Sequence, residues 1–403
     1  MSGRVPESPE VLVVGGGPAG STVAGLLARE GHEVLVVDRA TFPRPKPCGE
    51  CLNPGAVAAL RRLGLLETVL ALEPARLEGW SVGGGGRAVR GDFGGSLHGL
   101  GVPRERLDAA LLEHARHRGA RLLEGARVEE VAPAGAGTRP EVRLRLPGGG
   151  AATLRPRVVV GADGLRSRVA RSLGLVGARP RPAKASFTVR VRWTEGEAPG
   201  RGRLRVRGGI TLGIAPVDAR GRLGNVTVVA DTRRHRDALA GGGGALVRRV
   251  LSQRVGPPLP DVVGGPWSSG NFRQPVARPW APGVVLVGDA AGYYDPFTGQ
   301  GIYRALRSAE LAASAVVATL TGGTAGAAWT ELARYGRSWK AEVRPRRRLQ
   351  VVVDTVMTRS WLREPALAVL EQAGLLPALI RVTGDAAPVS SLLRPWGWTR
   401  NLE

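Results

Sequence analysis

Cysteine is almost absent from this sequence, which contains only Cys48 and Cys51 among 403 residues. Two cysteines exclude a disulfide framework and a four-cysteine zinc site, and we predict no metal site. Their Cys-x-x-Cys spacing would suit a redox-active dithiol, which needs a helix N-terminus and a lowered thiol pKa. A working dithiol and an incidental second cysteine therefore both stay open as interpretations.

Long apolar runs are also missing. No uninterrupted stretch approaches the roughly 18 residues that a membrane-spanning helix needs, and the best candidate, Leu311 to Leu320, fits a packed helix. The first ten residues are polar and lack the basic and apolar regions of a secretory signal. We therefore expect a soluble, cytoplasmic protein.

Acidic residues are outnumbered 34 to 57 by basic ones, which gives a formal net charge of +23. Lysine occurs only as Lys46, Lys184 and Lys340, so arginine carries nearly all of this charge and is scattered along the chain. No nucleic-acid module accompanies it, and we interpret it as compositional preference rather than as a sign of a nucleic-acid partner. The dense cluster Arg344–Arg348 fits either a solvated helix face or peripheral membrane contact through basic C-terminal helices.

The N-terminal region combines a strand, a glycine-rich turn and a helix. The apolar run Val11–Val14 leads into a Gly-x-Gly-x-x-Gly turn, and a second apolar run, Val34–Val37, ends in Asp38. The first glycine permits the tight turn, the second lets the backbone approach a pyrophosphate, and the third lets helix and strand pack closely. The helix N-terminus offers free N–H groups to phosphates, and Asp38 can accept hydrogen bonds from ribose hydroxyls. The predicted dinucleotide-binding residues here are Gly15, Gly17, Pro18, Ala19, Gly20, Asp38 and Arg39.

Two later strands also end in an acid beside a glycine. Val158–Val160 runs into Asp163-Gly164, and Val285–Val287 runs into Gly288-Asp289. Open α/β sheets bind ligands at the carboxyl ends of their strands, so we place both pairs at the same site. The turn Gly299–Gly301 opens the next helix, whose amides and dipole can stabilise an anion.

In this order and spacing, the three segments resemble the FAD-dependent class A monooxygenase superfamily, which includes para-hydroxybenzoate hydroxylases, flavin-dependent halogenases and geranylgeranyl reductases. The resemblance covers about residues 10–315. It implies FAD as the cofactor and NAD(P)H as a transient electron donor without a domain of its own. It further implies that Asp38 contacts the adenosine ribose, Arg104 the pyrophosphate, and Asp289 the ribityl or pyrophosphate region. It implies a dual FAD and nicotinamide segment at Asp163-Gly164. The residues implied beside the isoalloxazine are Pro296, Gly299, Gln300, Gly301 and Ile302.

A finer resemblance lies in Phe42–Pro54, whose Phe-Pro-Arg and Cys-Gly elements are similar to the geranylgeranyl-reductase-like branch. There this segment lies near the flavin ring, which makes Cys48 a cofactor contact and Cys48, Glu50 and Pro296 the candidate catalytic residues. Halogenases of the superfamily carry a Trp-x-Trp-x-Ile-Pro segment, and the comparable stretch here, Leu212–Pro216, lacks both tryptophans. Weaker polar candidates near the ring are His98, Tyr293, Tyr294 and Asp295.

The predicted fold class is α/β. It comprises a Rossmann-like FAD/NAD(P)-binding domain of the para-hydroxybenzoate hydroxylase type, an inserted antiparallel β-sheet substrate domain and a helical C-terminal segment. The predicted boundaries are residues 1–180 for the first part of the FAD-binding domain, with a substrate-domain excursion near 75–102, then 181–275 for the substrate domain, 276–330 for the second part of the FAD-binding domain and 331–403 for the helical segment.

The favoured activity is that of an NAD(P)H-dependent monooxygenase. It would use O2, through a flavin C4a-hydroperoxide, to hydroxylate or epoxidise a small aromatic, polyketide or isoprenoid metabolite. The alternative is a flavin-dependent reductase of isoprenoid C=C bonds, suggested by the Cys48 segment. A halogenase is disfavoured, and a flavin-binding protein without turnover is a further alternative. The sequence does not predict the oligomeric state.

Overall fold

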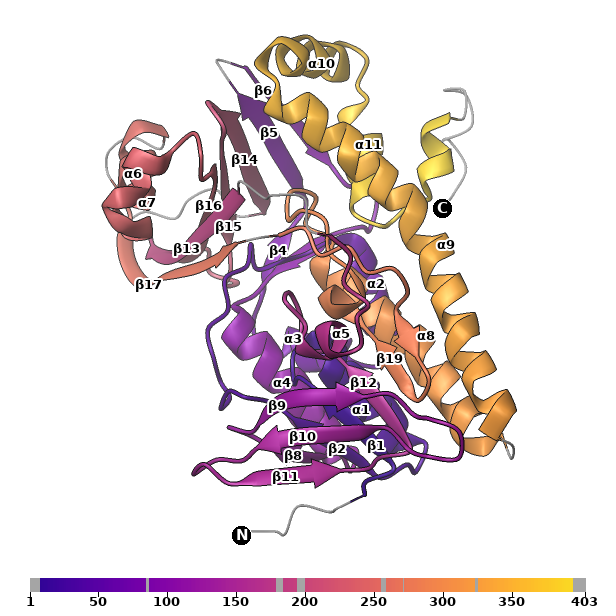
Figure 1. Ribbon diagram of the computed structural model, residues 1–403. Helices are drawn as coiled ribbons and strands as arrows, with labels where there is room; N and C mark the ends of the chain where they lie inside the picture. The colour runs from indigo at the N-terminus through magenta and orange to yellow at the C-terminus, as the bar shows by residue number, and fades with distance from the viewer. Residues whose placement is uncertain are drawn as a thin grey trace.

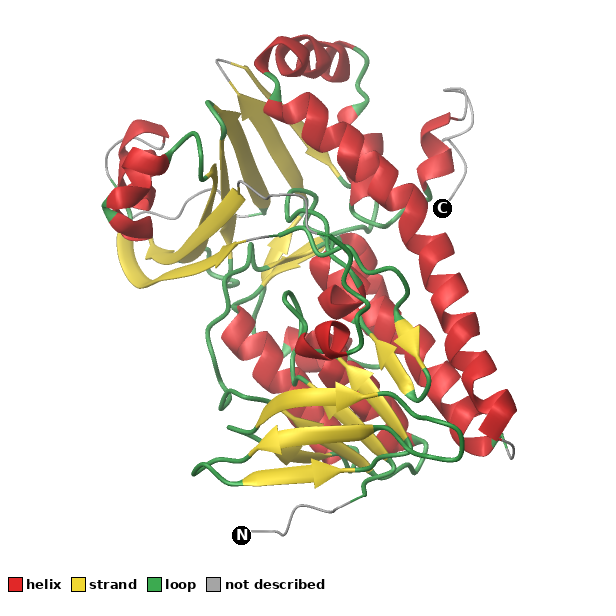
Figure 2. Ribbon diagram, viewed as in Figure 1, coloured by secondary structure: helices red, strands yellow, loops and turns green. Residues whose placement is uncertain are grey.

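A mostly parallel sheet forms the centre of the lower part of the molecule (Figures 1 and 2). The computed structural model describes residues 8–84, 87–178, 184–193, 200–254, 259–270, 272–322 and 325–393. The strands of this sheet are, in spatial order, β18 (Trp280–Ala281), β19 (Val284–Leu286), β12 (Val158–Gly161), β1 (Val11–Val14), β2 (Val34–Val37) and β8 (Arg121–Leu123). The pairs from β19 to β8 are parallel, and β18 joins the edge antiparallel. The continuous apolar sequences of β1, β2 and β12 are expected for strands buried on both faces.

Both faces of this sheet are covered. One layer contains the helices α1 (Pro18–Arg29), α4 (Arg104–His117) and α8 (Gly301–Thr321), and α1 packs against the other two. The other layer is an antiparallel meander of β9 (Arg127–Ala132), β10 (Glu141–Arg145) and β11 (Ala151–Leu154), followed along the chain by the short helix α5 (Arg168–Ser172). Apolar side chains from all three layers form one core, which fixes the strand ends that carry the predicted ligand-binding residues.

The second large sheet lies above the first. Its spatial order is β17 (Asp261–Gly270), β13 (Lys184–Arg192), β16 (Leu223–Asp231), β15 (Ile210–Pro216), β14 (Arg201–Arg207), β5 (Gly79–Gly84) and β6 (Arg87–Asp92). It is antiparallel, as predicted, except for the β5–β14 pair, which is parallel because β5 and β6 arrive from an earlier part of the chain. The helices α6 (Arg236–Ala240) and α7 (Gly242–Arg254) accompany it, and α7 packs its apolar face on β13 and β16.

A small sheet and two helices connect the two large sheets. The strands are β3 (Cys51–Leu52), β7 (Gly99–Gly101) and β4 (Ala75–Leu77), and the helices are α2 (Pro54–Arg62) and α3 (Leu66–Leu70). The 3-10 helix η1 (Gly288–Ala291) follows β19 and leads toward α8. This connecting region brings the Cys48 segment and the start of α8 to one level of the molecule.

The C-terminal part is helical where the structure describes it. It contains α9 (Ala325–Thr358), α10 (Ser360–Gln372), α11 (Leu376–Thr383) and the 3-10 helix η2 (Val389–Leu393), and residues 394–403 of the predicted helical segment lie outside the described residues. The helix α9 has 34 residues and therefore spans about 50 Å, from the lower sheet to the top of the molecule (Figure 1). The helices α10 and α11 pack against β6, where Leu367, Leu376 and Ile380 surround Phe93. Among the described helices, no single one has both the length and the apolar character needed to cross a membrane.

A buried carboxylate joins the end of α11 to the rest of the molecule. Asp385 accepts hydrogen bonds from Asn53 Nδ2 at 2.9 Å, from Gln300 Nε2 at 3.0 Å and from Arg346 Nε at 2.7 Å. These donors come from the N-caps of α2 and α8 and from the middle of α9. Burial raises the pKa of Asp385 to about 6, although Arg346 acts in the opposite direction. The turn that follows α11 is thus attached to the main body by a titratable group, in addition to the hydrogen bond that the Gly55 amide donates to the Gly384 carbonyl oxygen at 2.8 Å.

The stability of the protein is expected to depend on the protonation of Asp385. Because its folded pKa is raised from 3.8 to about 6, its stabilising contribution is complete below about pH 4 and is lost as pH rises through about 6. Relative to Asp385→Asn, the free energy of unfolding of the wild type should fall by about 3 kcal/mol over this range. Urea unfolding of both proteins measures the difference, with Asp261→Asn, an exposed carboxyl on β17, as control. If the difference in free energy of unfolding between the wild type and Asp385→Asn does not change with pH, the raised pKa of Asp385 is contradicted.

Candidate active site

The glycine-rich turn is shaped by three glycines with different surroundings. Gly15 has a φ of +106°, and a Cβ there would lie 2.6 Å from the Ala162 carbonyl oxygen. A Cβ on Gly20 would lie 1.8 Å from the Gly15 carbonyl oxygen, so β1 and α1 pack with no room for a side chain. At Gly17 the nearest atom is Arg44 Nη2 at 3.7 Å, which leaves open space for a ligand. The α1 N-terminus, which no side chain caps, faces that space with its free amides.

Asp38 stands at the end of β2 beside this turn. Its Oδ2 accepts from the Gly16 amide at 2.8 Å, and its Oδ1 accepts from the Ala40 amide at 2.8 Å. Each carboxylate oxygen can accept more than one hydrogen bond, so Asp38 can still receive ribose hydroxyls. The neighbouring Arg39 is exposed.

Three cations gather where α4 begins. The Arg104 side chain is 5% exposed and donates from Nε and Nη2 to the two Asp108 carboxylate oxygens, both at 2.8 Å. Arg44 Nη1 lies 3.3 Å from the same carboxylate, and Lys46 is close enough to interact electrostatically with both arginines. Burial, and then the Arg104 charge, lower the pKa of Lys46. The carboxylates of Asp108 and Asp289 both act on Lys46, so three cations and two carboxylates leave one positive charge over, which suits a diphosphate.

The Asp163 carboxylate accepts hydrogen bonds from the N-terminus of the helix that follows it, α5. Its Oδ2 accepts from the amides of Arg168 at 2.6 Å and Val169 at 3.2 Å, so it caps α5. Its Oδ1 is buried and lacks a hydrogen-bond partner within the described chain. Burial raises the pKa of Asp163. The carboxylate therefore has a local structural role and one oxygen left to accept a hydrogen bond.

The segment after β19 wraps around the start of α8. Gly288 has a φ of +58° and donates its amide to Ser308 Oγ at 2.8 Å, while a Cβ there would come within 3.0 Å of Ala19 Cβ. This close packing brings Asp289 beside the α1 N-terminus. The Gly299 turn, with a φ of +65°, then opens α8, whose N-terminal amides also face the cavity. Two helix N-termini thus converge on one site, an arrangement that favours anionic groups.

A cavity of about 330 Å³ lies between the lower sheet, the upper sheet and the C-terminal helices. The predicted residues that line it are Gly17, Pro18, Ala19, Cys48, Glu50, Arg104, Gly164, Gly288, Asp289, Pro296, Gly299, Gln300, Gly301 and Ile302. The predicted residues outside its lining are Gly15, Gly20, Asp38, Arg39 and Asp163. His98, one of the weaker candidates, also lies outside and contacts the Ser96 carbonyl oxygen.

Comparison with known proteins shows the family to which the chain belongs. Residues 8–341 match the family model described as FAD binding domain. The chain belongs to this family. It is 31% identical to menaquinone reductase from Mycobacterium tuberculosis over 365 residues, which cover 83% of this chain and 82% of the relative. It is 32% identical to 6-methylpretetramide 4-monooxygenase from Streptomyces rimosus over 318 residues, which cover 74% and 73%. The solved flavoprotein/dehydrogenase from Cytophaga hutchinsonii shares the fold, with a TM-score of 0.80 at 18% identity over 94% of this chain and 93% of that one.

The protein is therefore an FAD-dependent enzyme, and the predicted fold class and family resemblance are confirmed. The site fits the cofactor. The open space at Gly17 and the cations Arg44, Lys46 and Arg104 can hold the diphosphate, and Asp289 can accept from ribityl hydroxyls. Lys46 was missed by the sequence interpretation, although its position two residues after Arg44 in the branch-specific segment was an available signal.

The Cys48 segment of this flavoprotein is held by the upper sheet. The Cys48 carbonyl oxygen accepts from Asn225 Nδ2 at 3.0 Å and from Thr227 Oγ1 at 3.3 Å, both on β16. The Cys51 thiol donates to the Gly49 carbonyl oxygen at 3.2 Å. Burial, followed by the neighbouring Cys48 and Glu50, raises the pKa of Cys51, which opposes thiolate chemistry at this residue.

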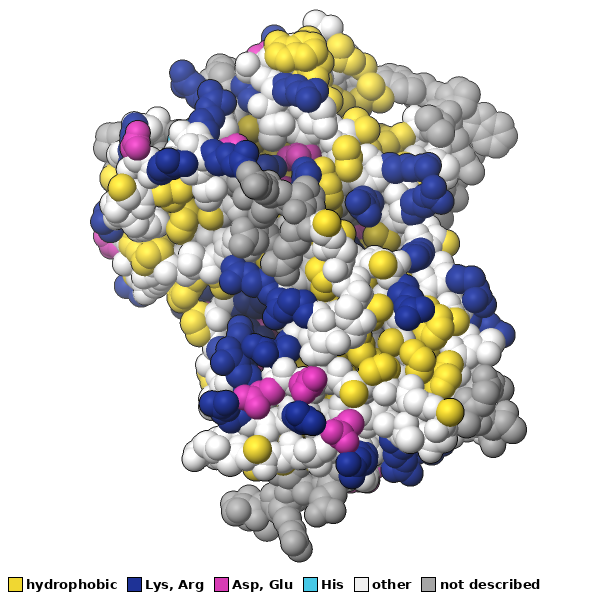
Figure 3. All heavy atoms as spheres, in the orientation of Figure 1, with side chains coloured by type: hydrophobic (Ala, Val, Ile, Leu, Met, Phe, Trp, Pro, Cys, Tyr) yellow, Lys and Arg dark blue, Asp and Glu magenta, His cyan; other side chains and the backbone are white. Residues whose placement is uncertain are grey.

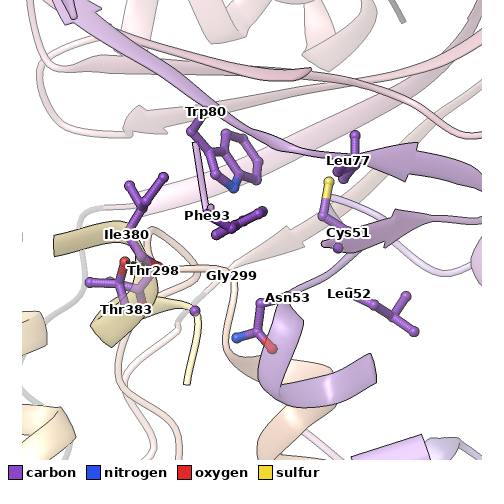
Figure 4. A pocket seen from close by; sticks show the side chains of 12 residues that line it. Cys51, Leu52, Asn53, Leu77, Trp80, Phe93, Thr298, Gly299, Ile380 and Thr383 are labelled. Atoms are coloured by element: carbon purple, nitrogen blue, oxygen red, sulfur yellow. Dashed lines mark hydrogen bonds between the residues drawn. The ribbon is translucent and has the colours of Figure 1, made fainter. Parts of the chain in front are cut away.

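Figure 4 shows the surroundings of Cys51. The residue lines a small cavity of about 30 Å³ together with Leu77, Trp80 and Phe93, and α11 contributes Ile380 to the same cavity. Both cysteines are free in the structure. Apolar packing of this kind suits a structural thiol better than one member of a redox-active pair.

Glu50 anchors the same segment from inside. It has a φ of +55°, is 2% exposed, and accepts from Arg190 Nη2 at 2.7 Å with both carboxylate oxygens. The Arg104 amide donates to Glu50 Oε1 at 2.9 Å, and Arg190 also reaches Glu105 at 3.3 Å. Burial raises the pKa of Glu50 in spite of Arg190. These contacts support a positioning role for Glu50, because they join β13, α4 and the Cys48 segment.

A second polar cluster lies on the side of the cavity away from α1. Lys184 Nζ donates to Asp295 Oδ2 at 3.0 Å and to Asp354 Oδ1 at 2.7 Å. These bonds connect β13 both to the loop that precedes α8 and to the helix α9. Gln350 Nε2 donates to Thr298 Oγ1 at 2.6 Å in the same region. Sequence interpretation missed Lys184 and Asp354, since they are 170 residues apart and neither belongs to a motif. The apolar lining around this cluster comes from Trp80, Val82, Leu204, Val353, Met357, Leu367, Leu370, Leu376, Leu379 and Ile380.

Proposed function

We propose that this flavoprotein reduces a C=C bond in an extended apolar substrate of isoprenoid type, with NAD(P)H as electron donor. The apolar lining supplied by β5, β14 and the three C-terminal helices supports a long hydrophobic substrate. The similarity to menaquinone reductase supports the same substrate class. Pro296 and the residues Gly299–Ile302 are proposed to lie beside the isoalloxazine, and Cys48 and Glu50 to shape its opposite edge.

The observation that carries the proposal is the apolar wall of the cavity, beside which Tyr293 offers a hydroxyl as proton donor. Burial raises the pKa of Tyr293 well above its usual value, with further contributions from Asp289 and Asp295. Burial also raises the pKa of Asp295, although Lys184 opposes it. Reduction of a C=C bond places a hydride on one carbon and a proton on the other, so it needs an acid near the substrate. When bound and reduced by NAD(P)H, the flavin would supply the hydride, and the protein would supply the proton, orient the alkene and exclude water.

A second candidate is the monooxygenase activity that the sequence favoured. The similarity to 6-methylpretetramide 4-monooxygenase supports it. The alternating small residues Thr211, Gly213 and Ala215 of β15 all line the cavity, which leaves space above the flavin segments for O2 and a planar substrate. An electron-rich phenol would need a base for activation, and the carboxylates of the second polar cluster, Asp295 and Asp354, are both paired with Lys184. We therefore rank oxygen transfer second and halogenation third.

Product analysis separates these activities. The FAD-loaded protein is incubated with NADH or NADPH and with menaquinone or geranylgeraniol in detergent, with and without O2, and products are identified by mass spectrometry. Gain of two hydrogens without O2, retained after the quinone ring has been reoxidised, is the expected result. Gain of one oxygen atom that requires O2 would move the assignment to a monooxygenase. Recovery of both test compounds unchanged, while NAD(P)H is oxidised, would overturn the proposed substrate class.

Tyr293 is proposed as the proton donor, and its hydroxyl can be removed without loss of the ring. Tyr293→Phe is expected to lower kcat about 100-fold, because a positioned acid contributes about this much to proton transfer. FAD content should stay unchanged, since the ring still packs beside Phe272, 6.2 Å away between centroids. The steady-state rate of saturation of a side-chain double bond of menaquinone measures the effect. Tyr294→Phe is the matched control, because the Tyr294 hydroxyl contacts Arg273 and the residue does not line the cavity. Equal kcat values for the two variants would exclude Tyr293 as the donor.

A further inference from the structure

An apolar surface forms where α9 ends and α10 begins. Val352 is 58% exposed at the end of α9, and Trp361 is 70% exposed at the start of α10. The remaining members are Val351 and Val369, also exposed, and we call these four residues the C-terminal apolar face. Figure 3 shows hydrophobic side chains gathered over α10 at the top of the molecule. Exposed apolar side chains that cluster in this way indicate a surface that is covered in use.

The inner sides of the same helices line the substrate cavity. Leu367 and Leu370 of α10, and Leu376 and Leu379 of α11, face the cavity, while Val369 faces solvent. The helix α10 is thus apolar toward both the cavity and the outside. Taken together, α10 and α11 are long and apolar enough for a membrane span, but they bend by 109° at the break. A bent pair of this kind fits a position within the interface of a bilayer rather than across it.

Positive charge borders the C-terminal apolar face. Arg344 and Arg348 are exposed on α9. Arg348 lies three and four residues before Val351 and Val352, and Arg344 lies seven and eight residues before them, so all four share one side of the helix. Arg359 is exposed between α9 and α10. The acidic residues of α10 are paired, Glu364 with Arg363 and Glu371 with Arg87. An apolar face with an unopposed basic border matches an anionic lipid surface.

We propose that the C-terminal apolar face docks on the surface of an anionic phospholipid bilayer, with Trp361 and Val352 in the interface and Arg344, Arg348 and Arg359 on the lipid headgroups. The helices α10 and α11 then lie between the bilayer and the cavity. A lipid-soluble substrate reaches the cavity from the membrane by passing these two helices. This route for the substrate rests on the proposed function, whereas the docking itself does not.

Co-sedimentation with vesicles tests the docking. The full-length FAD-loaded protein is mixed with vesicles of phosphatidylcholine alone or of phosphatidylcholine with phosphatidylglycerol. We expect about tenfold or stronger partitioning onto the anionic vesicles, reduced by salt. The double variant Trp361→Glu and Val352→Glu should lose about tenfold or more of this partitioning. The matched control, Val262→Glu and Val263→Glu, changes two exposed apolar residues of β17 and should bind like the wild type.

Two outcomes would overturn the docking. One is equal vesicle binding by the apolar-face variant and the control, or failure of the wild type to bind anionic vesicles. The other is a wild-type dimer, seen by light scattering, that the apolar-face variant converts to a monomer, because the face would then belong to a second copy. Substrate reduction in detergent is measured separately, so a protein that binds vesicles without reducing menaquinone contradicts only the proposed function. The substituted residues Trp361 and Val352 do not line the cavity.

Discussion

Substitution of Gly20 by alanine is expected to destabilise the protein by about 3 kcal/mol or more and to abolish FAD binding. The added Cβ would lie 1.8 Å from the Gly15 carbonyl oxygen, and the obstacle is backbone that cannot rotate away. Relief would require α1 to move off β1. That movement would displace the free amides of the α1 N-terminus and open the buried core beneath them.

Two other glycines serve as controls for Gly20→Ala. Gly25 lies on the same helix, and a Cβ there meets Ala115 at an ordinary contact of 3.4 Å, so Gly25→Ala should remain folded and bind FAD. Gly17 has open space, so Gly17→Ala should remain folded but bind FAD more weakly. Urea unfolding and flavin absorbance of the purified proteins give both quantities. Normal FAD content in Gly20→Ala would refute the proposed packing of the turn.

Substitution of Arg190 by methionine is expected to lower the free energy of unfolding by about 3–5 kcal/mol. The reason is that Glu50, which is 2% exposed, would keep a carboxylate with no cation beside it. The Cys48 segment would lose its attachment to β13, so flavin affinity should fall as well. Arg192→Met on the same strand is the control, because Arg192 is exposed. A loss within about 1 kcal/mol of that control would contradict the importance of this pair.

A second substitution separates the effect of the unpaired buried charge of Glu50 from the effect of the lost contact with Arg190. Adding Glu50→Gln to Arg190→Met removes the unpaired carboxylate, so the double variant should recover most of the lost stability. The effect of Arg190→Met should also depend on pH. Glu50 already has a raised pKa, and a carboxyl of this kind stabilises the fold when protonated and less as pH rises through its folded pKa. The damage should therefore be smaller in mild acid than at neutral pH, and this dependence should vanish in the double variant.

The sequence determined the flavin-binding part of this protein because its signals are local. A tight turn needs Gly15, close helix–strand packing needs Gly20, and an apolar strand that ends in Asp38 or Asp289 needs only a few consecutive residues. Parallel strands then bring their carboxyl ends to one edge of the sheet, so segments far apart in the chain meet without any special side-chain contact. The family and the fold class follow from these segments alone.

The residues around the proposed substrate cavity could be identified only from the tertiary structure. Lys184 meets Asp295 and Asp354 only because the upper sheet, the loop before α8 and the long helix α9 pack together. Nothing in the local sequence marks Glu50 as the partner of Arg190, which is 140 residues away. The parallel pairing of β5 with β14 is likewise a long-range event.

The predicted cofactor site and the proposed substrate cavity differ in the same way, because the first depends on local sequence signals and the second on long-range contacts. Flavin contacts depend on backbone geometry, which glycine and strand patterns specify over short stretches of sequence. The shape and polarity of the proposed substrate cavity depend instead on which side chains distant elements bring together, and on the burial that raises the pKa values of Tyr293 and Asp295. The sequence by itself therefore identified an FAD-binding protein, and only the packed structure revealed an apolar cavity with a paired polar cluster beside it, because burial and long-range contacts exist only after the chain has folded.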